Sequence, residues 1–257
     1  MQIFQLHENP AFPHPEAAEK DGLLAMGGDL HPQRLLKAYA WTIFPWYSQE
    51  TPVLWWSPDP RLVLFCETLH IPKSLCRELN RGQVSVTVDR AFAEVIRGCA
   101  RATRPEGEGT WLTPEMIMAY TRLHDLGYAH SVEAWQGGRV VGGIYGVALG
   151  RVFFGESMFY TLPNASKIAL VALIHVLRQR GFVCLDCQQT TQHMLRFGGR
   201  EVSRRCLLSL VQNSLAETGL VAGSWDGGED LVWDSDTRRF CAQPPRASSQ
   251  GTGRRCV

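Results

Sequence analysis

The sequence predicts an α+β fold, in which helices pack on a mixed sheet and a small unit precedes that sheet. Beyond residue 62 the hydrophobic pattern indicates a strand, helices, three strands, a helix and a last strand. A strand that follows a crossover helix is expected to lie parallel to an earlier one, which makes the sheet mixed. The 257 residues therefore divide into a small N-terminal domain (1–62), a main domain (63–220) and a C-terminal extension (221–257) whose last part is expected to be disordered.

The N-terminal unit is rich in Pro, Gly and Trp. A helical pattern runs through "HPQRLLKAYA" (31–40), and the segment "IFPWYSQETPVLWWSPDPR" (43–61) contains four prolines. These prolines allow only short strands and turns. The aromatic side chains of this segment either form a local core or build a pocket for bases and apolar groups, and the residues alone leave both alternatives open.

A helix is expected after residue 72, where charged and apolar residues separate onto two faces. Lys73, Arg77 and Arg81 are spaced four residues apart and share one face, whereas Leu75 and Leu79 share another. The simplest interpretation of the basic face is that solvent covers it.

The next elements have clear local signals. Residues 84–88 alternate as a strand, and Asp89 is placed to cap a helix over 92–99. A second helix is predicted between Thr113, which precedes a proline and is suited to the N-cap, and Gly127, which is suited to the C-terminal stop.

Three strands joined by Gly-containing turns are predicted over 131–159, which makes an antiparallel meander. Asn164 then caps a helix that ends at Gly181. The chain continues into an apolar strand over 182–188, which is the strand expected to lie parallel to an earlier one.

Composition excludes several classes of protein. Lys and Arg number 26 against 25 Asp and Glu, so no global field attracts a polyanion and any nucleic-acid surface must be local. The first residues lack the pattern of a signal peptide, and the longest apolar run (168–177) is shorter than the roughly 20 residues that span a bilayer. The eight scattered cysteines indicate reduced thiols, so we expect a cytoplasmic protein without membrane contact.

The segment "GFVCLDCQQT" (181–190) has two cysteines around an aspartate. On a strand, Cys184 and Cys187 point to opposite faces, so neither a zinc site nor a thioredoxin-type pair is expected, and we predict no metal. Asp186 and Gln188 share one face. A carboxylate in an apolar run needs a partner or a chemical role, so Asp186 is either a buried structural residue or, with Gln188, a group that orients and deprotonates an attacking amine.

Eight motifs occur in order over about residues 1–210, and together they resemble the leucyl/phenylalanyl-tRNA protein transferase family. Several of them, such as the double-tryptophan motif, are long and unusual. The motifs are "GLLAMGGDL" (22–30), "IFPWYS" (43–48), "LWWSPDPR" (54–61), "EGTWLT" (108–113), "HSVEAW" (130–135), "GGIYGVALGRVFFGESMF" (142–159), "NASKIAL" (164–170) and "LDCQ" (185–188).

The resemblance implies an acetyltransferase-like (GNAT) main domain behind a small N-terminal domain, with no cofactor. It implies transfer of Leu or Phe, and less readily Met, from aminoacyl-tRNA to the α-amino group of proteins that begin with Arg or Lys, which marks them for degradation. The expected partners are aminoacyl-tRNA and these acceptor proteins, and the chain is expected to be a monomer.

The resemblance also implies roles for particular residues. Asp186 and Gln188 are the catalytic pair, with Asp186 polarising the Gln188 amide that holds the incoming amine. Trp46 and Trp111 line the site of the terminal adenosine, and the alternative for each is a core tryptophan. Glu156 holds the cationic end or the amine of the acceptor, with a structural cross-strand pair as its alternative.

Two further groups of residues follow from the same resemblance. The apolar pocket for the aminoacyl side chain is expected from Ile144, Phe153 and Met158, with Ile144 standing where relatives are expected to have Met. The basic face of Lys73, Arg77 and Arg81 becomes a track for tRNA phosphates.

Three other functions are compatible with parts of the sequence. An N-acetyltransferase that uses acetyl-CoA needs a Gly-rich turn to hold pyrophosphate, and "MFYTLPNASK" (158–167) contains no glycine. An aminoacyl-tRNA-dependent peptidoglycan ligase would share the donor but not the motifs. A non-catalytic RNA-binding protein would tolerate the loss of the Asp186 carboxylate.

Overall fold

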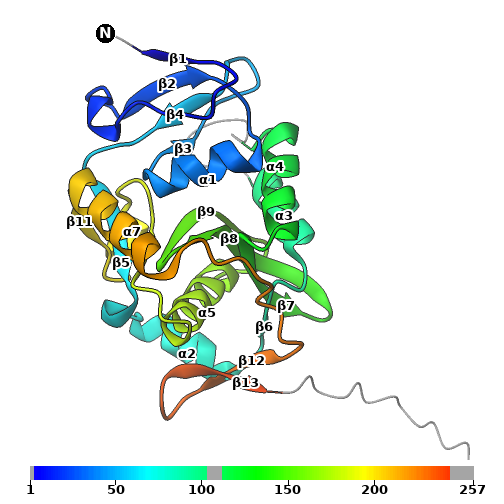
Figure 1. The fold of residues 1–257 in the computed structure, drawn as a ribbon. Coiled ribbons are helices and arrows are strands. Elements are labelled where there is room, and N and C mark those ends of the chain that lie inside the picture. The colour runs from blue at the N-terminus through cyan, green and yellow to red at the C-terminus, as the bar shows by residue number, and fades with distance from the viewer. Residues whose placement is uncertain (1–2, 103–111, 244–257) are drawn as a thin grey trace, which may run out of the picture.

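Figure 1 shows the computed structural model of the protein, which describes residues 3–102 and 112–243. A small sheet lies at one end of the molecule, and α1 (Pro32–Ala40) lies between it and a large sheet. The small sheet has the strand order β1, β2, β4, β3, with β1 and β2 parallel and the other pairs antiparallel. Its strands are β1 (Phe4–Leu6), β2 (Leu23–Gly27), β3 (Phe44–Pro45) and β4 (Leu54–Trp56), and a short 3-10 helix, η1 (Pro15–Ala17), lies between β1 and β2 in the chain.

The large sheet is mixed, as predicted. Its strand order within the described residues is β11, β5, β10, β9, β8, β7, β6, β12, β13. β10 lies parallel to β9, and every other neighbouring pair is antiparallel. The strands are β5 (Arg61–Phe65), β6 (Ser85–Val88), β7 (Ala129–Gln136), β8 (Arg139–Leu149), β9 (Val152–Tyr160), β10 (Cys184–Asp186), β11 (Arg200–Val202), β12 (Asp230–Asp234) and β13 (Arg239–Gln243).

Helices cover both faces of the large sheet. The core on one face contains residues of α1, α3, α4 and α7, and the core on the other face contains residues of α2 and α5. The helix α5 is buried on almost every side, which explains its nearly continuous apolar sequence. The helices are η2 (Cys66–Thr68), α2 (Lys73–Arg81), α3 (Phe92–Arg101), α4 (Pro114–Asp125), α5 (Ala165–Gln179), α6 (Gln192–Leu195) and α7 (Arg204–Thr218).

The predicted helix ends are confirmed where a capping bond forms. The Thr113 side chain accepts a hydrogen bond from the Met116 backbone N–H at the start of α4, and Gly127 follows its end with φ +78°. Asn164 stands at the N-cap of α5 as predicted, but its side chain caps no backbone group. Its Oδ1 instead accepts a hydrogen bond from Lys167 Nζ at 2.9 Å.

The prediction that Asp89 caps α3 is wrong. The residue at the start of α3 is Ala91, whereas the Asp89 carboxylate accepts hydrogen bonds from the backbone N–H groups of Ser131 at 2.8 Å and Trp225 at 3.0 Å. It also lies 2.7 Å from His130 Nδ1. Asp89 therefore fastens the segment after α7 to the sheet, and this contact joins residues too distant in sequence for a local pattern to indicate.

The C-terminal extension contributes strands that the sequence analysis did not predict. β12 pairs with β6 at Leu231 and Val86, and β13 pairs with β12, so this segment extends the large sheet. The part expected to be disordered falls largely on residues 244–257, outside the described residues. The small sheet ends at Trp56 and the large sheet begins at Arg61. The division into domains at residues 62 and 220 stays a prediction.

Candidate active site

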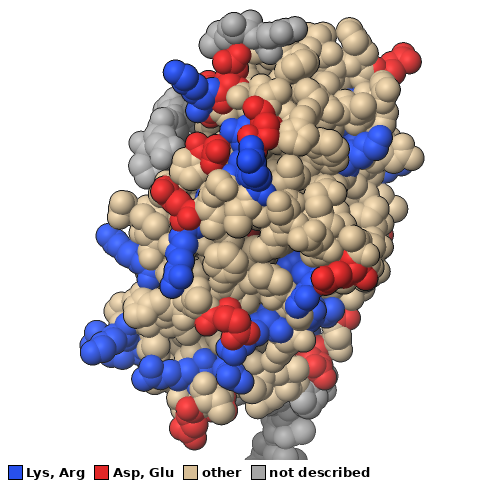
Figure 2. Space-filling view, turned by 60° about the vertical axis from the view of Figure 1, so that its left-hand side comes forward, with Lys and Arg blue, Asp and Glu red and all other residues tan. Residues whose placement is uncertain are grey.

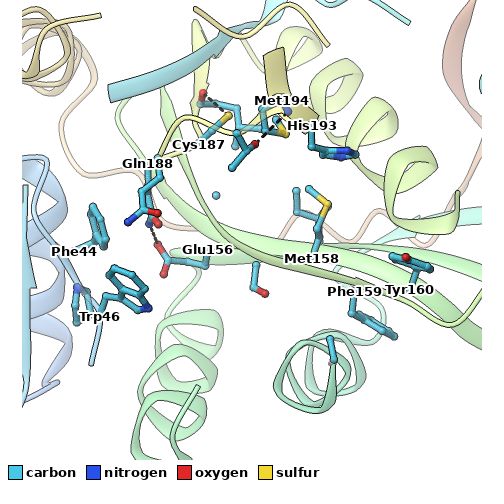
Figure 3. A pocket seen from close by; sticks show the side chains of 18 residues that line it. Phe44, Trp46, Glu156, Met158, Phe159, Tyr160, Cys187, Gln188, His193 and Met194 are labelled. Carbon is cyan, nitrogen blue, oxygen red and sulfur yellow. Dashed lines mark hydrogen bonds between the residues drawn. The ribbon is translucent and has the colours of Figure 1, made fainter. Parts of the chain in front are cut away.

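A cavity opens where two parallel strands separate. β9 and β10 are paired as far as Phe154 and Asp186, and beyond these residues the two segments are no longer paired. The ends of parallel strands commonly form ligand sites, because the gap between them is lined by the residues that follow. The cavity has a volume of about 650 Å³ and is lined mainly by residues 44–46, 155–160 and 187–194. Figure 3 shows Phe44 and Trp46 toward one end of it, beside Glu156 and Gln188, with Met158, Phe159 and Tyr160 further along β9.

A bulge in β9 places Glu156 on the cavity wall. Gly155 lies opposite Gly146 and Ser157 lies opposite Tyr145, so Glu156 is the extra residue. Bulges redirect side chains and are frequent beside active sites. After the bulge the alternation along β9 changes, and Met158 lies opposite Ile144, with both lining the cavity. A Cβ atom on Gly146 would lie 2.1 Å from a backbone oxygen, so glycine is required there.

Glu156 is held by three donors from distant parts of the chain. Tyr39 Oη donates to its Oε1 at 2.8 Å, Tyr120 Oη donates to its Oε2 at 2.8 Å, and Gln188 Nε2 donates to Oε1 at 3.0 Å. Both tyrosines are completely buried, and burial raises their pKa well above the usual value, so they remain protonated donors. The sequence analysis did not identify either tyrosine, because each looks like one apolar residue on a helix face.

A neutral Glu156 carboxyl would satisfy every contact of its network with Tyr39 and Tyr120, in an arrangement where one tyrosine accepts the carboxyl proton and donates to the other tyrosine instead of to Glu156. The two tyrosine oxygens also lie 2.6 Å from each other, so three oxygen–oxygen contacts link Tyr39, Tyr120 and the carboxyl. Two hydroxyl groups supply two protons, and the third contact is satisfied when the carboxyl carries one. Burial, opposed by the tyrosine hydrogen bonds, raises the pKa of Glu156 to about 7. This carboxyl can therefore gain or lose a proton near neutral pH.

Asp186 lies behind the cavity wall rather than in the cavity. Its side chain is 0% exposed and forms an ion pair with Arg61, which is also 0% exposed. Its Oδ1 accepts a hydrogen bond from the backbone N–H of Gln188 at 2.9 Å. The expected contact between the Asp186 carboxylate and the Gln188 side-chain amide is therefore wrong, because that amide nitrogen donates to Glu156.

The ion pair between Arg61 and Asp186 holds the conformation of the segment that follows β10. Gln188 has φ +63°, which is costly for a residue with a side chain and persists only where contacts hold it. The Asp186 bond to its N–H supplies such a contact. Arg61 Nη1 also donates to the Thr42 carbonyl at 2.6 Å, so the same pair ties β10 to the N-terminal unit. The sequence analysis did not identify Arg61. Its position as a charged residue at the start of an apolar strand is the one feature of the sequence that could have indicated it.

Comparison with known proteins decides the family. A family model described as leucyl/phenylalanyl-tRNA protein transferase matches residues 63–212, and the model of its N-terminal domain matches residues 28–59. The chain belongs to the leucyl/phenylalanyl-tRNA protein transferase family. It is therefore an aminoacyltransferase enzyme that takes Leu or Phe from charged tRNA and passes it to protein.

Relatives of this family match nearly the whole chain. The transferase of Anaeromyxobacter sp. (strain K) is 54% identical over 89% of this chain and 97% of its own length. That of Syntrophobacter fumaroxidans is 56% identical over 88% of this chain and 97% of its own length.

Similar solved structures are more remote. The structure of L-PGS from Bacillus licheniformis is 9% identical, covers 75% of this chain and 71% of its own, and has a TM-score of 0.43. A GCN5-related N-acetyltransferase from Kribbella flavida is 12% identical, covers 56% of this chain and 54% of its own, and has a TM-score of 0.35. These similarities are too low to support an argument.

The residues expected from the transferase family are only partly assembled at the cavity. Trp46, Ile144, Glu156, Met158 and Gln188 all line it. Phe153 does not line it, because it precedes the bulge and packs in the core, where its ring centroid lies 5.8 Å from that of Trp225. Trp111 lies outside the described residues. The cavity-lining residues that the sequence analysis missed include Cys187, His193 and Met194.

Trp46 is suited to contact a planar group. Its side chain is 39% exposed, and its ring centroid lies 5.7 Å from that of Trp56. Trp56 Nε1 donates to the Trp46 carbonyl at 2.7 Å, which fixes the backbone at this position. An exposed ring held in this way can stack on a base.

The basic face of α2 is present but lies away from the cavity lining. Leu75 and Leu79 are buried, and Lys73, Arg77 and Arg81 are exposed, as predicted. Arg81 forms an ion pair with Glu78 at 2.7 Å. Figure 2 shows several Lys and Arg side chains over the lower half of this side of the molecule, the height at which α2 lies in Figure 1. A role of this face in binding tRNA stays a prediction.

The two cysteines of the transferase's "LDCQ" region point to opposite faces of the sheet, as predicted. Cys184 belongs to the core on the face covered by α1, α3, α4 and α7, whereas Cys187 packs on the α5 side. Burial raises the pKa of both thiols, which keeps them protonated. Residues 3–102 and 112–243 contain no group of three or more His, Cys, Asp or Glu placed to hold a metal ion. They also contain no helix of the length and hydrophobicity needed to cross a membrane.

Proposed function

We propose that this transferase moves Leu or Phe, and less readily Met, onto the α-amino group of proteins that begin with Arg or Lys, which marks them for degradation. The reaction is aminolysis of the aminoacyl-tRNA ester, and we place it in the cytoplasm and in a monomer. The observation that carries the proposal is the Glu156 and Gln188 pair at one end of a largely apolar cavity, with Trp46 beside it. This arrangement suits a donor with an apolar side chain and a terminal base.

Gln188 is proposed to hold the attacking amine. Its Nε2 is occupied by Glu156, which leaves its Oε1 to accept a hydrogen bond from the amine N–H. An N-terminal amine has a pKa of about 7.7 to 8.0, so it is mostly protonated at neutral pH and must lose a proton before it attacks. Glu156, with a pKa of about 7, is matched to take that proton.

In the proposed step, one bond forms, one bond breaks and each proton has a destination. The amine nitrogen attacks the ester carbonyl carbon, and the bond from that carbon to the ribose oxygen breaks. Glu156 in its charged form takes the proton of the acceptor ammonium, which completes the three-proton network with Tyr39 and Tyr120. The second proton of the amine is lost as the amide forms, and the leaving ribose oxygen gains one. Asp186 contributes by holding the backbone of Gln188.

The aminoacyl side chain is proposed to lie against Ile144 and Met158, which face each other across the β8 and β9 pair. Leu185, Cys187 and Met194 add further apolar surface. Unbranched methionines fill irregular spaces and adapt to both Leu and Phe. The packing of these residues also supports discrimination against charged side chains.

An acetyl-CoA-dependent activity is disfavoured by the start of α5. A Cβ atom on Gly142 would lie 2.6 Å from the Ala165 side chain and 3.0 Å from the Ser166 backbone N. The first turn of α5 is therefore packed directly on β8 on this side, and the segment before it has no glycine to hold pyrophosphate on backbone N–H groups.

The test is transfer of labelled Leu from charged tRNA to a peptide with N-terminal Arg, compared with the same peptide starting with Ala. We expect transfer to the Arg peptide alone, and a strong loss of transfer in Gln188→Ala and Asp186→Ala. Equal labelling of both peptides would refute the proposed acceptor, and full activity of both variants would refute the proposed site.

A further inference from the structure

The cavity contains a polar atom that the proposed chemistry does not use. His193, on α6, lines the cavity, and its Nε2 is buried without a hydrogen-bond partner. Buried polar atoms are normally paired, so an unpaired one on a residue that lines a substrate cavity points to a partner supplied by the substrate. The ring is fixed in place by an edge contact with Phe197, with centroids 5.2 Å apart.

His193 has cationic neighbours and lies apart from the acidic pair. Figure 3 shows Glu156 and Gln188 toward one end of the cavity and His193 toward the other. Burial, followed by the charges of Lys167 and Arg196, lowers the pKa of His193, so the ring is neutral at neutral pH. In the tautomer with the proton on Nε2, this atom is a donor that seeks an oxygen acceptor.

The two cations come from different helices. Lys167 is in the first turn of α5, half-buried, with its Nζ 2.9 Å from Asn164 Oδ1. Arg196 follows α6 and is exposed. Lys167 and Arg196 act on His193 through their charges but do not line the cavity, so we define the basic end as the cavity-lining His193 with these two neighbouring cations, and the acidic end as Glu156 with Gln188.

We propose that the basic end binds a phosphodiester of the 3′ strand of the donor tRNA, with His193 Nε2 as a direct hydrogen-bond donor. This inference rests on the proposed function and assigns the phosphate of the donor and the cationic groups of the acceptor to opposite ends, while the terminal base of the donor stays at Trp46. An acceptor with N-terminal Arg or Lys carries positive charge on its amine and side chain, so the basic end repels it and the acidic end attracts it. A nucleic-acid backbone has the opposite preference.

The basic end also connects to the predicted tRNA track. The Phe197 carbonyl, just beyond Arg196, accepts a hydrogen bond at 2.9 Å from the backbone N–H of His70, close before α2. Arg196 and the cations of α2 thus lie on two segments that are distant in the chain but joined by this hydrogen bond. A strand of phosphates that leaves the cavity past Arg196 would continue along α2.

The test compares two donors, leucyl-tRNA and leucyl-adenosine, because only the first carries phosphodiesters. We expect Lys167→Gln/Arg196→Gln to raise KM for leucyl-tRNA about tenfold and to lower the slope of its log–log salt dependence by about 0.7, the contribution of one single-strand phosphate contact. His193→Ala should raise the same KM, with partial rescue in His193→Gln, which keeps an N–H donor. In all three variants, KM for leucyl-adenosine and for the Arg peptide should stay unchanged.

The matched control is Arg151→Gln, which removes one exposed charge just before β9, at the opposite end of that strand from Tyr160. It should leave both KM values unchanged. A rise in KM for the peptide alone, an equal rise with both donors, or an unchanged KM for leucyl-tRNA would each overturn the proposal. Direct binding of charged tRNA to the unaltered and variant chains separates this result from a failure of the proposed function, which would appear as no transfer by the unaltered chain.

Discussion

Two buried glutamates on the same sheet have the same raised pKa but differ in what surrounds them. Glu156 and Glu133 both have a pKa raised to about 7, in each case mainly by burial. Glu133 is 0% exposed and accepts hydrogen bonds from Thr87 Oγ1 at 2.5 Å and from Ser131 Oγ, both on neighbouring positions of β6 and β7. Glu156 is 8% exposed, lines the cavity and is bonded by residues from α1, α4 and the segment after β10.

The difference shows that a raised carboxyl pKa indicates only burial. A functional site is indicated instead by exposure to a cavity and by hydrogen-bond partners that come from separate elements. The partners of Glu133 are close to it in the sheet, and neither Glu133 nor these described partners line the candidate active-site cavity. The partners of Glu156 come from three separate elements that meet only at the cavity. We therefore interpret Glu133 as structural and Glu156 as functional, and the following experiments can break or sharpen this distinction.

The largest expected effect separates the two glutamates by activity. Glu156→Gln keeps the shape of the side chain but cannot take a proton from the acceptor amine, so kcat for Leu transfer should fall by roughly 10²–10⁴-fold. Glu133→Gln is the matched control and should stay within about twofold of the unaltered chain, within the small range expected of a substitution away from the chemistry. Steady-state transfer to the Arg peptide measures both, and equal losses in the two variants would end the distinction.

A third buried carboxylate sharpens the comparison, because Asp186 is paired with a cation. Asp186→Ala leaves Arg61 buried and uncompensated, so the free energy of unfolding should fall by about 3–5 kcal/mol in addition to the loss of transfer. Urea unfolding measures this change. The double variant Arg61→Met/Asp186→Leu, which removes both charges, should recover much of the stability but not the activity. A single variant as stable as the unaltered chain would contradict the role of the ion pair.

The pH dependence of stability tests whether Glu133 is neutral in the fold. Its folded pKa of about 7 is above the unfolded value of 4.5, so its contribution is fully present below pH 4.5 and is lost as pH rises through 7. Glu133→Gln should therefore match the unaltered chain at pH 4.5 and exceed it at pH 8, by up to about 3 kcal/mol from a shift of this size. Urea unfolding at the two pH values checks the sign. A variant that is less stable at pH 8 would contradict it.

The smallest expected effect is a shift in the pH dependence of transfer. The Tyr120 hydrogen bond lowers the pKa of Glu156, so Tyr120→Phe should raise that pKa and move the rise of kcat to higher pH. Tyr128→Phe, which removes a hydroxyl that is not bonded to Glu156, should leave the midpoint in place. If the midpoint does not move in Tyr120→Phe, Glu156 is not the group whose protonation controls kcat.

Much of the fold could be predicted because its signals are local. The meander of β7, β8 and β9, the caps of α4 and the two faces of α2 each follow from residues within a few positions of one another. The strands β12 and β13 were missed, since the polar sequence around them resembles an irregular tail. The strand with which β12 pairs, β6, is also about 145 residues earlier in the chain (Leu231 against Val86). The role of Asp89 was mistaken for the same reason.

The site was predicted in part, through motifs rather than through geometry. By itself, the sequence determined the family, the strand after α5 and the divergence of Cys184 and Cys187, and its resemblance to the family drew attention to Asp186, Gln188 and Glu156. Only the tertiary structure decided that Arg61 neutralises Asp186, that a bulge turns Glu156 toward Tyr39 and Tyr120, and that His193 has a buried nitrogen without a partner. Local periodicity determines which face a side chain takes, whereas ion pairs and shared protons depend on distances between segments that meet only after folding.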